Sequence, residues 1–400
     1  MHLKSICCAI FAVFTLLGRN VCAEESFAQW KELFYDQALA AGIKKQTLDL
    51  YVPQMDLLPK IIEQDVKLPE YIPTFTSYIE SRLTQERIDI GRQLAKQHEA
   101  LLQQISKKYN VPAEYLLALW AMETNYGAFM GNVDILDALA SLAYHPRRRT
   151  FFTSQLISYL RILERETIPP KVGSWDAGFG HFQFMPGTFE IYAVDGDKDK
   201  ARDLISSLPD AFASAANYLH QLGWDPANLW GREVIVPQNI DWDATTDKLK
   251  KVDEWIALGI KPANLESFPE NERSIQAALT APMGSKGPTF LTYSNFRYIM
   301  NWNKYELYAL TAGLMADSIA GRFKGFYTQP NGEKIKSEEI QQLQEYLLNM
   351  GYHIGNADGK LGKNTKHAIR SVQGKLGLIP DGFPDRQLLN LLTTKKQEEK

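Results

Sequence analysis

The chain has 400 residues, of which 45% are hydrophobic and 23% are charged, and its formal net charge is −3. A chain of this length and composition can build a large hydrophobic core and more than one domain. Its weakly acidic balance gives no support for nucleic-acid binding, because proteins that bind phosphate backbones carry basic surfaces.

The first 23 residues have the pattern of an export signal. Lys4 precedes an apolar run from Ile6 to Leu17, and Val21-Cys22-Ala23 puts small residues where signal peptidase cleaves. The run is too short to span a bilayer, and Val21 is a poor fit to the small residue of a lipoprotein cleavage site. We therefore expect a soluble mature protein that begins near Glu24 and has no membrane anchor.

The predicted mature chain has no cysteine, because Cys7, Cys8 and Cys22 all lie in the signal segment. Neither disulfides nor a cysteine nucleophile is therefore expected. The signal segment also carries two positive charges, Lys4 and Arg19, and their removal takes the formal net charge from −3 to −5.

From Phe27 to about Gly321 the sequence is mainly helical, since apolar residues recur at three- and four-residue spacing. Val234-Ile235-Val236 is the best candidate for a short strand. The polar stretch from Tyr327 to Lys334 combines turn-forming and charged residues, which indicates a linker. All eight tryptophans, from Trp30 to Trp302, precede this linker, so we expect two unlike domains.

A small module of three helices is predicted after the linker. Asp358-Gly359 and Asp381-Gly382 supply tight turns before its second and third helices. The expected apolar faces are Ile340, Leu343 and Leu347, then Ala368, Ile369, Val372 and Leu376 behind an Asn364-Thr365 cap, and last Leu388, Leu389 and Leu392.

Glu123 lies near the end of a predicted helix that has Pro112 in its first turn. Leu116, Leu119 and Glu123 stand at i, i+3 and i+7, so the carboxyl shares the stripe of the core leucines, with Trp120 beside it. Burial without a cationic partner raises the pKa of a carboxyl group, and a general acid for glycosidic cleavage requires that property. The alternative is a helix-end glutamate that reaches solvent.

The residues after Glu123 favour the functional interpretation. Thr124, Asn125 and Tyr126 place hydroxyl, amide and phenol groups next to the acid, as a cleft for a polar substrate requires. Gly127 then ends the helix.

At this segment, residues 118–127, the sequence resembles the B-type lytic murein transglycosylase family. The resemblance continues through most of the chain in the right order, and its matches are jointly specific. They are Asp137-Ala138-Leu139-Ala140-Ser141-Leu142-Ala143-Tyr144, Gly173-Ser174-Trp175, Gln183-Phe184-Met185-Pro186, Ala215-Ala216-Asn217-Tyr218-Leu219 and Ser294-Asn295-Phe296-Arg297.

The resemblance implies a mainly α fold, in which a lysozyme-like transglycosylase domain with minor β structure precedes a small three-helix peptidoglycan-binding domain. The expected boundaries are a signal peptide at 1–23, a catalytic domain at 24–325, a linker at 326–336, the binding domain at 337–394 and a disordered tail at 395–400. Periplasmic localisation and peptidoglycan glycan strands as the partner follow from the same resemblance, and partners in the cell-wall machinery are left open.

The resemblance also implies the chemistry. Glu123 protonates the leaving oxygen and then, as a carboxylate, takes the proton of the muramoyl C6 hydroxyl, so that a 1,6-anhydro end forms without a cofactor. The substrate-binding residues that it implies are Ser174, Gln183, Asn303, Tyr308, Tyr78 and Tyr126.

The sequence departs from the family pattern in the loop from Asp176 to Phe182. Asp176, Phe179, His181 and Phe182 replace small residues there, and we expect the bulkier loop to alter subsite shape. Asn301 stands where the family commonly has a basic residue. His181 is interpreted as a structural histidine rather than as one that titrates in function.

Two charged clusters have competing interpretations. Arg147, Arg148 and Arg149 either meet acidic stem peptides or form a solvated face, and the solvated face is favoured. Four aspartates occupy positions 1, 3, 5 and 9 of an EF-hand-like loop, but the sixth position is Lys200 and the twelfth is Ser206, so a weak structural calcium site and a bare acidic loop are equally supported. These four are Asp195, Asp197, Asp199 and Asp203.

Two other functions compete with the transglycosylase. A hydrolytic muramidase would use Asp176 as a second carboxylate to activate water, and its product would carry one additional water. A non-catalytic scaffold of the same fold would bind the wall without releasing soluble muropeptides. The sequence leaves open endo or exo action, glycan length and stem-peptide preference.

Overall fold

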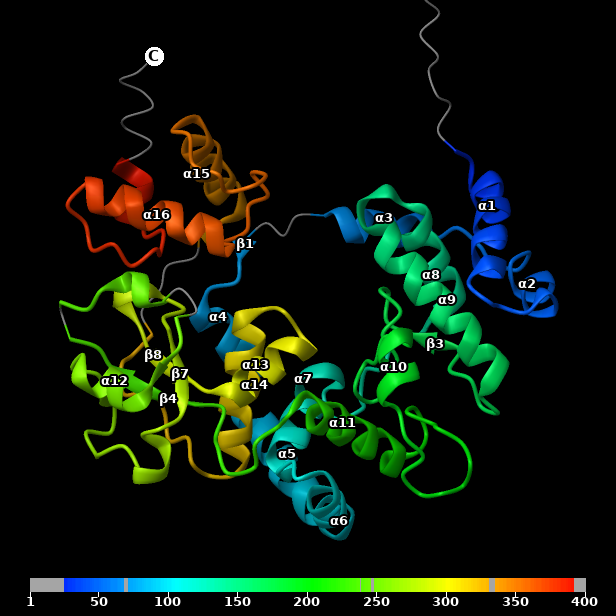
Figure 1. Ribbon diagram of the computed structural model, residues 1–400, viewed down its shortest axis with the longest axis horizontal. Coiled ribbons are helices and arrows are strands. Elements are labelled where there is room, and N and C mark those ends of the chain that lie inside the picture. The colour runs from blue at the N-terminus through cyan, green and yellow to red at the C-terminus, as the bar shows by residue number, and fades with distance from the viewer. Residues whose placement is uncertain (1–24, 68–70, 238, 246–247, 331–334, 392–400) are drawn as a thin grey trace, which may run out of the picture. The chain divides into compact units, whose positions relative to one another are not determined.

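The computed structural model describes residues 25–67, 71–237, 239–245, 248–330 and 335–391 (Figure 1). The predicted signal peptide and tail therefore lie outside the described residues. The chain divides into two compact units, Met1–Pro53 and Gln54–Lys400. Among the described residues, none of the helices combines the length and apolar character that a bilayer crossing requires.

The first unit contains two helices, α1 (Phe27–Ala40) and α2 (Lys45–Tyr51). A capping box begins α1, since the Ser26 side chain accepts from the amide of Gln29 and the Gln29 side chain accepts from the amide of Ser26. The buried side chains of α1 are Trp30, Phe34 and Ala38, which recur at four-residue spacing on one face.

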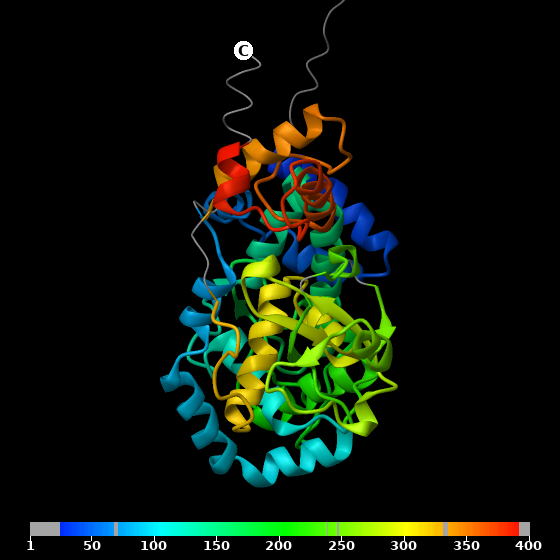
Figure 2. The same ribbon diagram turned by 90° about the vertical axis from the view of Figure 1, so that its left-hand side faces the viewer.

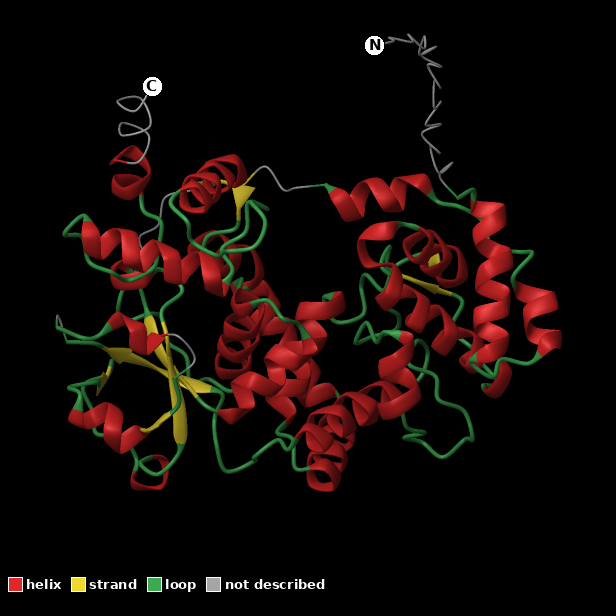
Figure 3. Ribbon diagram, turned by 45° about the horizontal axis from the view of Figure 1, so that its top comes forward, coloured by secondary structure: helices red, strands yellow, loops and turns green. Residues whose placement is uncertain are grey.

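The second unit is mainly α, as predicted, and Figure 3 shows how helices dominate it. Its helices before the linker, in chain order, are α3 (Pro59–Val66), α4 (Phe75–Arg82), α5 (Gln85–Gln97), α6 (Glu99–Tyr109), α7 (Ala113–Thr124), α8 (Ile135–Tyr144), α9 (Arg149–Arg165), α10 (Pro186–Tyr192), α11 (Leu208–Leu222), α12 (Val252–Ala257), α13 (Ser294–Trp302) and α14 (Glu306–Ile319). The short 3-10 helices are η1 (Pro146–Arg148), η2 (Trp242–Thr245), η3 (Glu270–Glu272) and η4 (Gly284–Lys286).

An antiparallel sheet of five strands interrupts the helices, and it was largely missed by sequence reasoning. Its order is β5-β7-β8-β4-β6. The predicted strand at 234–236 is confirmed as the end of β4, but the other strands were not anticipated. Their bounds are β4 (Gly231–Ile235), β5 (Lys250–Lys251), β6 (Lys261–Pro262), β7 (Gln276–Thr280) and β8 (Thr289–Thr292).

Helix α7 lies in the middle of the helical part, where it packs against α5, α6, α11 and α14 (Figure 1). Its residues from Tyr115 to Ala121 are all buried, so the helix has no solvated face and the predicted stripe understates its burial. Pro112 is the extended N-cap rather than a residue of the first turn. The neighbouring α5 and α6 meet at an angle at His98, as Figure 2 shows.

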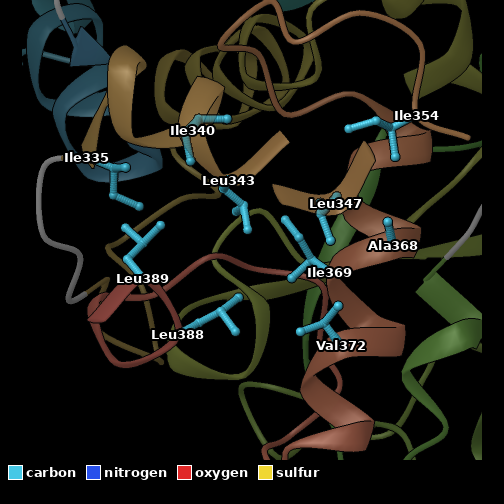
Figure 4. Close-up of a cluster of buried hydrophobic side chains, with 10 residues drawn as sticks. All are labelled: Ile335, Ile340, Leu343, Leu347, Ile354, Ala368, Ile369, Val372, Leu388 and Leu389. Carbon is cyan, nitrogen blue, oxygen red and sulfur yellow. The ribbon is translucent and has the colours of Figure 1, made fainter. Parts of the chain in front are cut away.

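The C-terminal module packs around its own core, shown in Figure 4. Helix α15 (Ser337–Asn349) and helix α16 (Lys363–Lys375) supply most of it, and Leu388 and Leu389 come from a third helix beginning at residue 386. Leu392 lies outside the described residues. Helix α16 begins after Gly362, so Asn364-Thr365 lies in its first turn and is not its cap.

The two predicted Asp-Gly turns of the module are built in the same way. The Gln344 side chain donates to Asp358 and accepts from the amide of Gly359, at 3.0 and 2.7 Å. Gln373 repeats this with Asp381 and Gly382, at 2.9 and 2.8 Å. Because both glutamines are buried and fully engaged, each turn is fixed to a helix by a buried amide.

The described residues at both ends of the predicted linker make specific backbone contacts. The amides of Tyr327 and Thr328 donate to the Glu233 carboxylate, at 3.1 and 2.8 Å. At the other end, β9 (Ile335–Lys336) pairs antiparallel with β1 (Tyr71–Ile72). A second two-stranded pair, β2 (Val133–Asp134) with β3 (Val172–Gly173), lies next to the candidate site.

Candidate active site

Glu123 lies in the last turn of α7, one residue before its C-terminal end. The residue is half-buried, and its carboxyl group is enclosed by protein groups. Burial raises the pKa of Glu123 to about 7, although hydrogen bonds from Tyr308 and Trp302 act in the opposite direction and the charge of Asp176 adds to the rise. Near neutral pH this carboxyl can therefore both give and take a proton.

Two aromatic side chains that lie far from Glu123 in the sequence donate hydrogen bonds to its carboxyl group. The buried Tyr308 hydroxyl, on α14, donates to Glu123 Oε1. The Trp302 side chain, in the last turn of α13, also hydrogen-bonds to Glu123. Tyr308 was predicted as a substrate contact, whereas its hydroxyl here meets the acid, and Trp302 was missed.

The polar residues that follow Glu123 hold the end of α7. Thr124 Oγ1 donates to the carbonyl of His181 at 2.8 Å, and Asn125 Oδ1 accepts from Arg87 Nε at 3.0 Å. The Tyr126 hydroxyl donates to the carbonyl of Arg87 at 2.7 Å. The Tyr126 phenol is thus engaged by backbone in the free protein, and its predicted contact with a substrate stays a prediction.

Arg87, on α5, is a functional neighbour that sequence reasoning missed. Its guanidinium donates to the carbonyl of Ala121 in the last turn of α7 and to the Asn125 side chain. A cation at this end stabilises the helix, because the free carbonyls there carry partial negative charge. Nothing in the sequence around Arg87 distinguishes it from a surface arginine.

Ser174 and Asp176 form one polar unit after β3. The Ser174 hydroxyl lies 2.7 Å from Asp176 Oδ1 and 3.0 Å from the carbonyl of Gly178. Asp176 is close enough to Glu123 for its negative charge to raise the pKa of that carboxyl. The structure thus brings Asp176 into the surroundings of Glu123.

Gln183 and Asn303 are both tied to backbone. Gln183 Nε2 donates to the carbonyls of Met130 and Gly180, at 3.1 and 3.0 Å. Asn303 is exposed at the C-terminal end of α13, where its Oδ1 accepts from the amide of Tyr305 at 3.0 Å. Both have a structural role in the free protein.

Tyr78, on α4, is buried and belongs to an aromatic pair with Tyr305, whose ring lies 5.4 Å away edge to face. The Arg82 guanidinium lies over the Tyr78 ring at 3.8 Å. Burial raises the pKa of Tyr78, Arg82 lowers it, and the charge of Glu123 raises it further, which places Tyr78 in the same electrostatic surroundings as the acid.

The two phenylalanines of the loop from Asp176 to Phe182 are buried. Phe179 and Phe182 are each 1% exposed and pack against Phe189 and Phe212. Phe182 also meets the Trp302 ring at 6.1 Å. The rings of Phe179 and Phe182 therefore belong to the core, and the expected effect of the bulkier loop on subsite shape stays a prediction. Phe184 is likewise buried.

The arginine run is partly exposed to solvent, and its side chains also contact other protein groups. Arg147 and Arg148 both pair with Asp65 of α3, whose side chain is 2% exposed. Arg149 donates to the carbonyl of Tyr144 at 2.6 Å. The side chains of Arg147 and Arg148 are 41% and 39% exposed, as the favoured solvated face requires, but Asp65, which lies 82 residues before Arg147 in the chain, pairs with both.

In the acidic loop, the carboxylates of Asp195, Asp197 and Asp199 converge, with one oxygen from each within 4.8 Å of the others. Asp203 is not part of this group, and it accepts from the amides of Ile205 and Ser206, both at 2.9 Å. Lys200 adopts φ +77°, the conformation for which calcium loops use glycine at this position. Three of the four predicted ligands thus suit a hard cation.

Asp210, in the first turn of α11, was missed. It is fully buried and accepts from the amides of Gly196 and Asp203, at 2.7 and 2.8 Å. Burial raises the pKa of Asp210, and these amide bonds oppose that rise. Asp210 therefore closes the acidic loop from the helix side.

Comparisons with known proteins identify the family of both parts of the chain. A family model described as "Transglycosylase SLT domain" matches residues 26–317, and one described as "Putative peptidoglycan binding domain" matches residues 336–392. Membrane-bound lytic murein transglycosylase B of Escherichia coli is 28% identical over 249 residues, which are 61% of this chain and 66% of that relative. The match thus spans slightly less than two thirds of the relative.

Solved structures extend the likeness to the C-terminal module. SltB3 from Pseudomonas aeruginosa, solved in complex with NAG-anhNAM-pentapeptide, has a TM-score of 0.87 and 37% identity, over 92% of this chain and 100% of that one. The lytic transglycosylase Slt35 of Escherichia coli, in complex with bulgecin A, has a TM-score of 0.63 and 25% identity, over 73% of this chain and 93% of that one.

Proposed function

Because the chain belongs to the transglycosylase SLT domain family, we propose that it is a lytic murein transglycosylase of the bacterial wall. It cleaves the MurNAc-β-1,4-GlcNAc bond of peptidoglycan and leaves a 1,6-anhydromuramoyl end. The observation that carries this proposal is the enclosed Glu123 carboxyl at the end of α7, to which the Tyr308 hydroxyl donates, and burial raises the pKa of this carboxyl to about 7. Such a group can serve first as acid and then as base.

In the first step, protonated Glu123 gives its proton to the glycosidic oxygen, and the bond from that oxygen to C1 of the muramoyl sugar breaks. In the second step, the Glu123 carboxylate takes the proton of the C6 hydroxyl as O6 attacks C1, which closes the anhydro ring and restores the acid. Hydrogen bonds from Tyr308 and Trp302 stabilise the carboxylate between the two steps. No water is consumed, and no cofactor is needed.

We assign glycan binding to Ser174, Gln183, Asn303 and Tyr78, with Tyr308 acting mainly on Glu123. The exposed Asn303 and the Tyr78–Tyr305 pair offer an amide and aromatic rings, which suit sugar hydroxyls and sugar faces. The first test is release of soluble muropeptides from purified sacculi. If the pure protein binds sacculi but releases none, the non-catalytic scaffold is correct.

Asp176→Asn separates the transglycosylase from the muramidase. The asparagine Oδ1 can still accept from Ser174, so only the charge is lost, and turnover is expected to fall by less than about tenfold because the second step needs no water-activating base. A loss as severe as that of a Glu123 variant would support the two-carboxylate muramidase. The rate of muropeptide release from sacculi measures this.

The C-terminal module, proposed as the domain at 337–394, retains the enzyme on the wall, where tethering raises the local concentration of glycan. A truncated protein that ends at Gly325 loses this module and the β9 partner of β1. It is expected to cleave short soluble glycans at a similar rate and to bind sacculi less well in a pull-down. Equal binding of truncated and full-length protein would exclude the tethering role.

We propose a weak structural calcium site at Asp195, Asp197 and Asp199. These carboxylates would hold the ion, and its charge would offset their mutual repulsion. Millimolar calcium is expected to stabilise the protein by about 1–3 kcal/mol, seen as a higher melting temperature. Magnesium, and calcium with an Asp197→Asn variant, serve as controls. If calcium does not change the melting temperature, the loop is an acidic loop without a calcium site.

Export into the periplasm is proposed on the pattern of residues 1–23. The relative in Escherichia coli is named as membrane-bound, whereas Val21 in this chain is a poor match to a lipoprotein signal. Cell fractionation, with the N-terminal sequence of the mature protein, tests this.

A further inference from the structure

His181 contacts the residues on both sides of the catalytic glutamate. The Trp120 indole N–H, three residues before Glu123, donates to His181 Nδ1 at 3.0 Å. Thr124, one residue after Glu123, donates its hydroxyl to the His181 carbonyl at 2.8 Å. His181 thus hydrogen-bonds to the end of α7 through both its ring and its backbone.

The Trp120 bond fixes the form of the histidine. An indole N–H only donates, so Nδ1 must be the unprotonated nitrogen. The ring also hydrogen-bonds to the backbone of Ile205, and burial lowers the pKa of His181 despite the nearby charge of Asp203. His181 is therefore a neutral ring in a single tautomer.

Gly127 lies close to the His181 imidazole and restricts the orientation of the ring. A Cβ at Gly127, where φ is +84°, would lie 2.7 Å from the imidazole. The chain after α7 therefore folds directly over the ring. The backbone amide of His181 donates to the carbonyl of Leu204 at 2.9 Å, and this bond anchors the loop to the segment before α11.

The next residue continues the contact with the site. The ring of Phe182 lies 6.1 Å from that of Trp302, which hydrogen-bonds to Glu123. The pair His181-Phe182 is therefore connected to Glu123 only through its neighbours, by Trp120 and Thr124 on α7 and by Trp302, which hydrogen-bonds to the carboxyl.

We propose that His181 is a positioning residue for the cleavage reaction, acting through Trp120 and Thr124 to fix the Glu123 carboxyl. This rests on the proposed function. His181 contacts the neighbours of Glu123 and not its carboxyl, so its replacement is expected to change turnover and not glycan affinity. Since displacement of a reacting group by about 1 Å can lower a rate by about a hundredfold, the effect on kcat is measurable.

The test compares two variants of the full-length protein. His181→Leu keeps the volume but removes the acceptor for Trp120, and is expected to lower kcat by roughly tenfold to a hundredfold with KM within about twofold. His181→Asn places an oxygen near the position of Nδ1 and is expected to restore most of kcat. His220→Leu, at an exposed histidine of α11, is the matched control and is expected to leave kcat unchanged.

The results separate positioning from simple packing. A His181→Leu protein with normal kcat but a lower melting temperature, or with a raised KM alone, would overturn the proposal, as would failure of asparagine to restore kcat. If His181→Leu does not fold, Thr124→Val, which removes the other bond, is read in the same way. If the wild-type protein releases no muropeptides, the proposed function is wrong. That result is distinct from a loss of kcat in the His181 variants, which tests the positioning role.

Discussion

Glu123→Gln is expected to lower turnover on peptidoglycan by about a thousandfold, with little change in glycan affinity or fold. The amide keeps the shape of the side chain and can accept from Tyr308, but it has no proton to transfer to the glycosidic oxygen. Muropeptide release and sacculus pull-down measure the two quantities. Glu114→Gln, at the other end of α7, is the matched control and is expected to retain turnover.

The same variant also has a predicted effect on stability. Because the folded pKa of Glu123, about 7, lies above the value of 4.5 for a free glutamate, wild-type stability falls as pH rises between these values. The substituted amide cannot ionise, so the variant is expected to be more stable than wild type at mildly alkaline pH, by about 1–3 kcal/mol, and not at acidic pH. Equal pH dependence of the two melting temperatures would show that the carboxyl is well hydrated.

The second large effect is on the pH dependence of cleavage. The free enzyme must carry a proton on Glu123, so kcat/KM is expected to fall about tenfold per pH unit above a pKa of about 7. Tyr308→Phe removes a donor to the carboxylate, which raises the pKa of Glu123, so the alkaline limb should move to higher pH while turnover falls. An alkaline limb that stays in place in this variant would assign it to another group.

Much of the helical framework was predictable, because it rests on local signals. The helix that carries Glu123 and the two longer helices of the C-terminal module follow from apolar spacing, and the Asp-Gly turns from backbone preference. The five-stranded sheet was missed because its central strands do not alternate. All four residues of β8 are buried, and β7 has the sequence Gln-Ala-Ala-Leu-Thr, which is equally suited to a helix.

The candidate site was predictable only in part, because contacts between distant residues decide it. Glu123 was recognisable from its place on a buried helix. That Thr124, Asn125 and Tyr126 serve the end of this helix depends on His181 and Arg87, which no local pattern connects to them. Likewise, the buried Asp65 turns Arg147 and Arg148 into structural residues, and no spacing rule reveals that pairing.

The mass of the product shows whether the Glu123 carboxyl drives an intramolecular reaction. Sacculi digested with the full-length protein, analysed by mass spectrometry without chemical reduction, are expected to yield muropeptides that end in 1,6-anhydromuramoyl residues. Wild-type digests whose terminal muramoyl residues carry one additional water would contradict this account and would show that the enzyme is a hydrolytic muramidase.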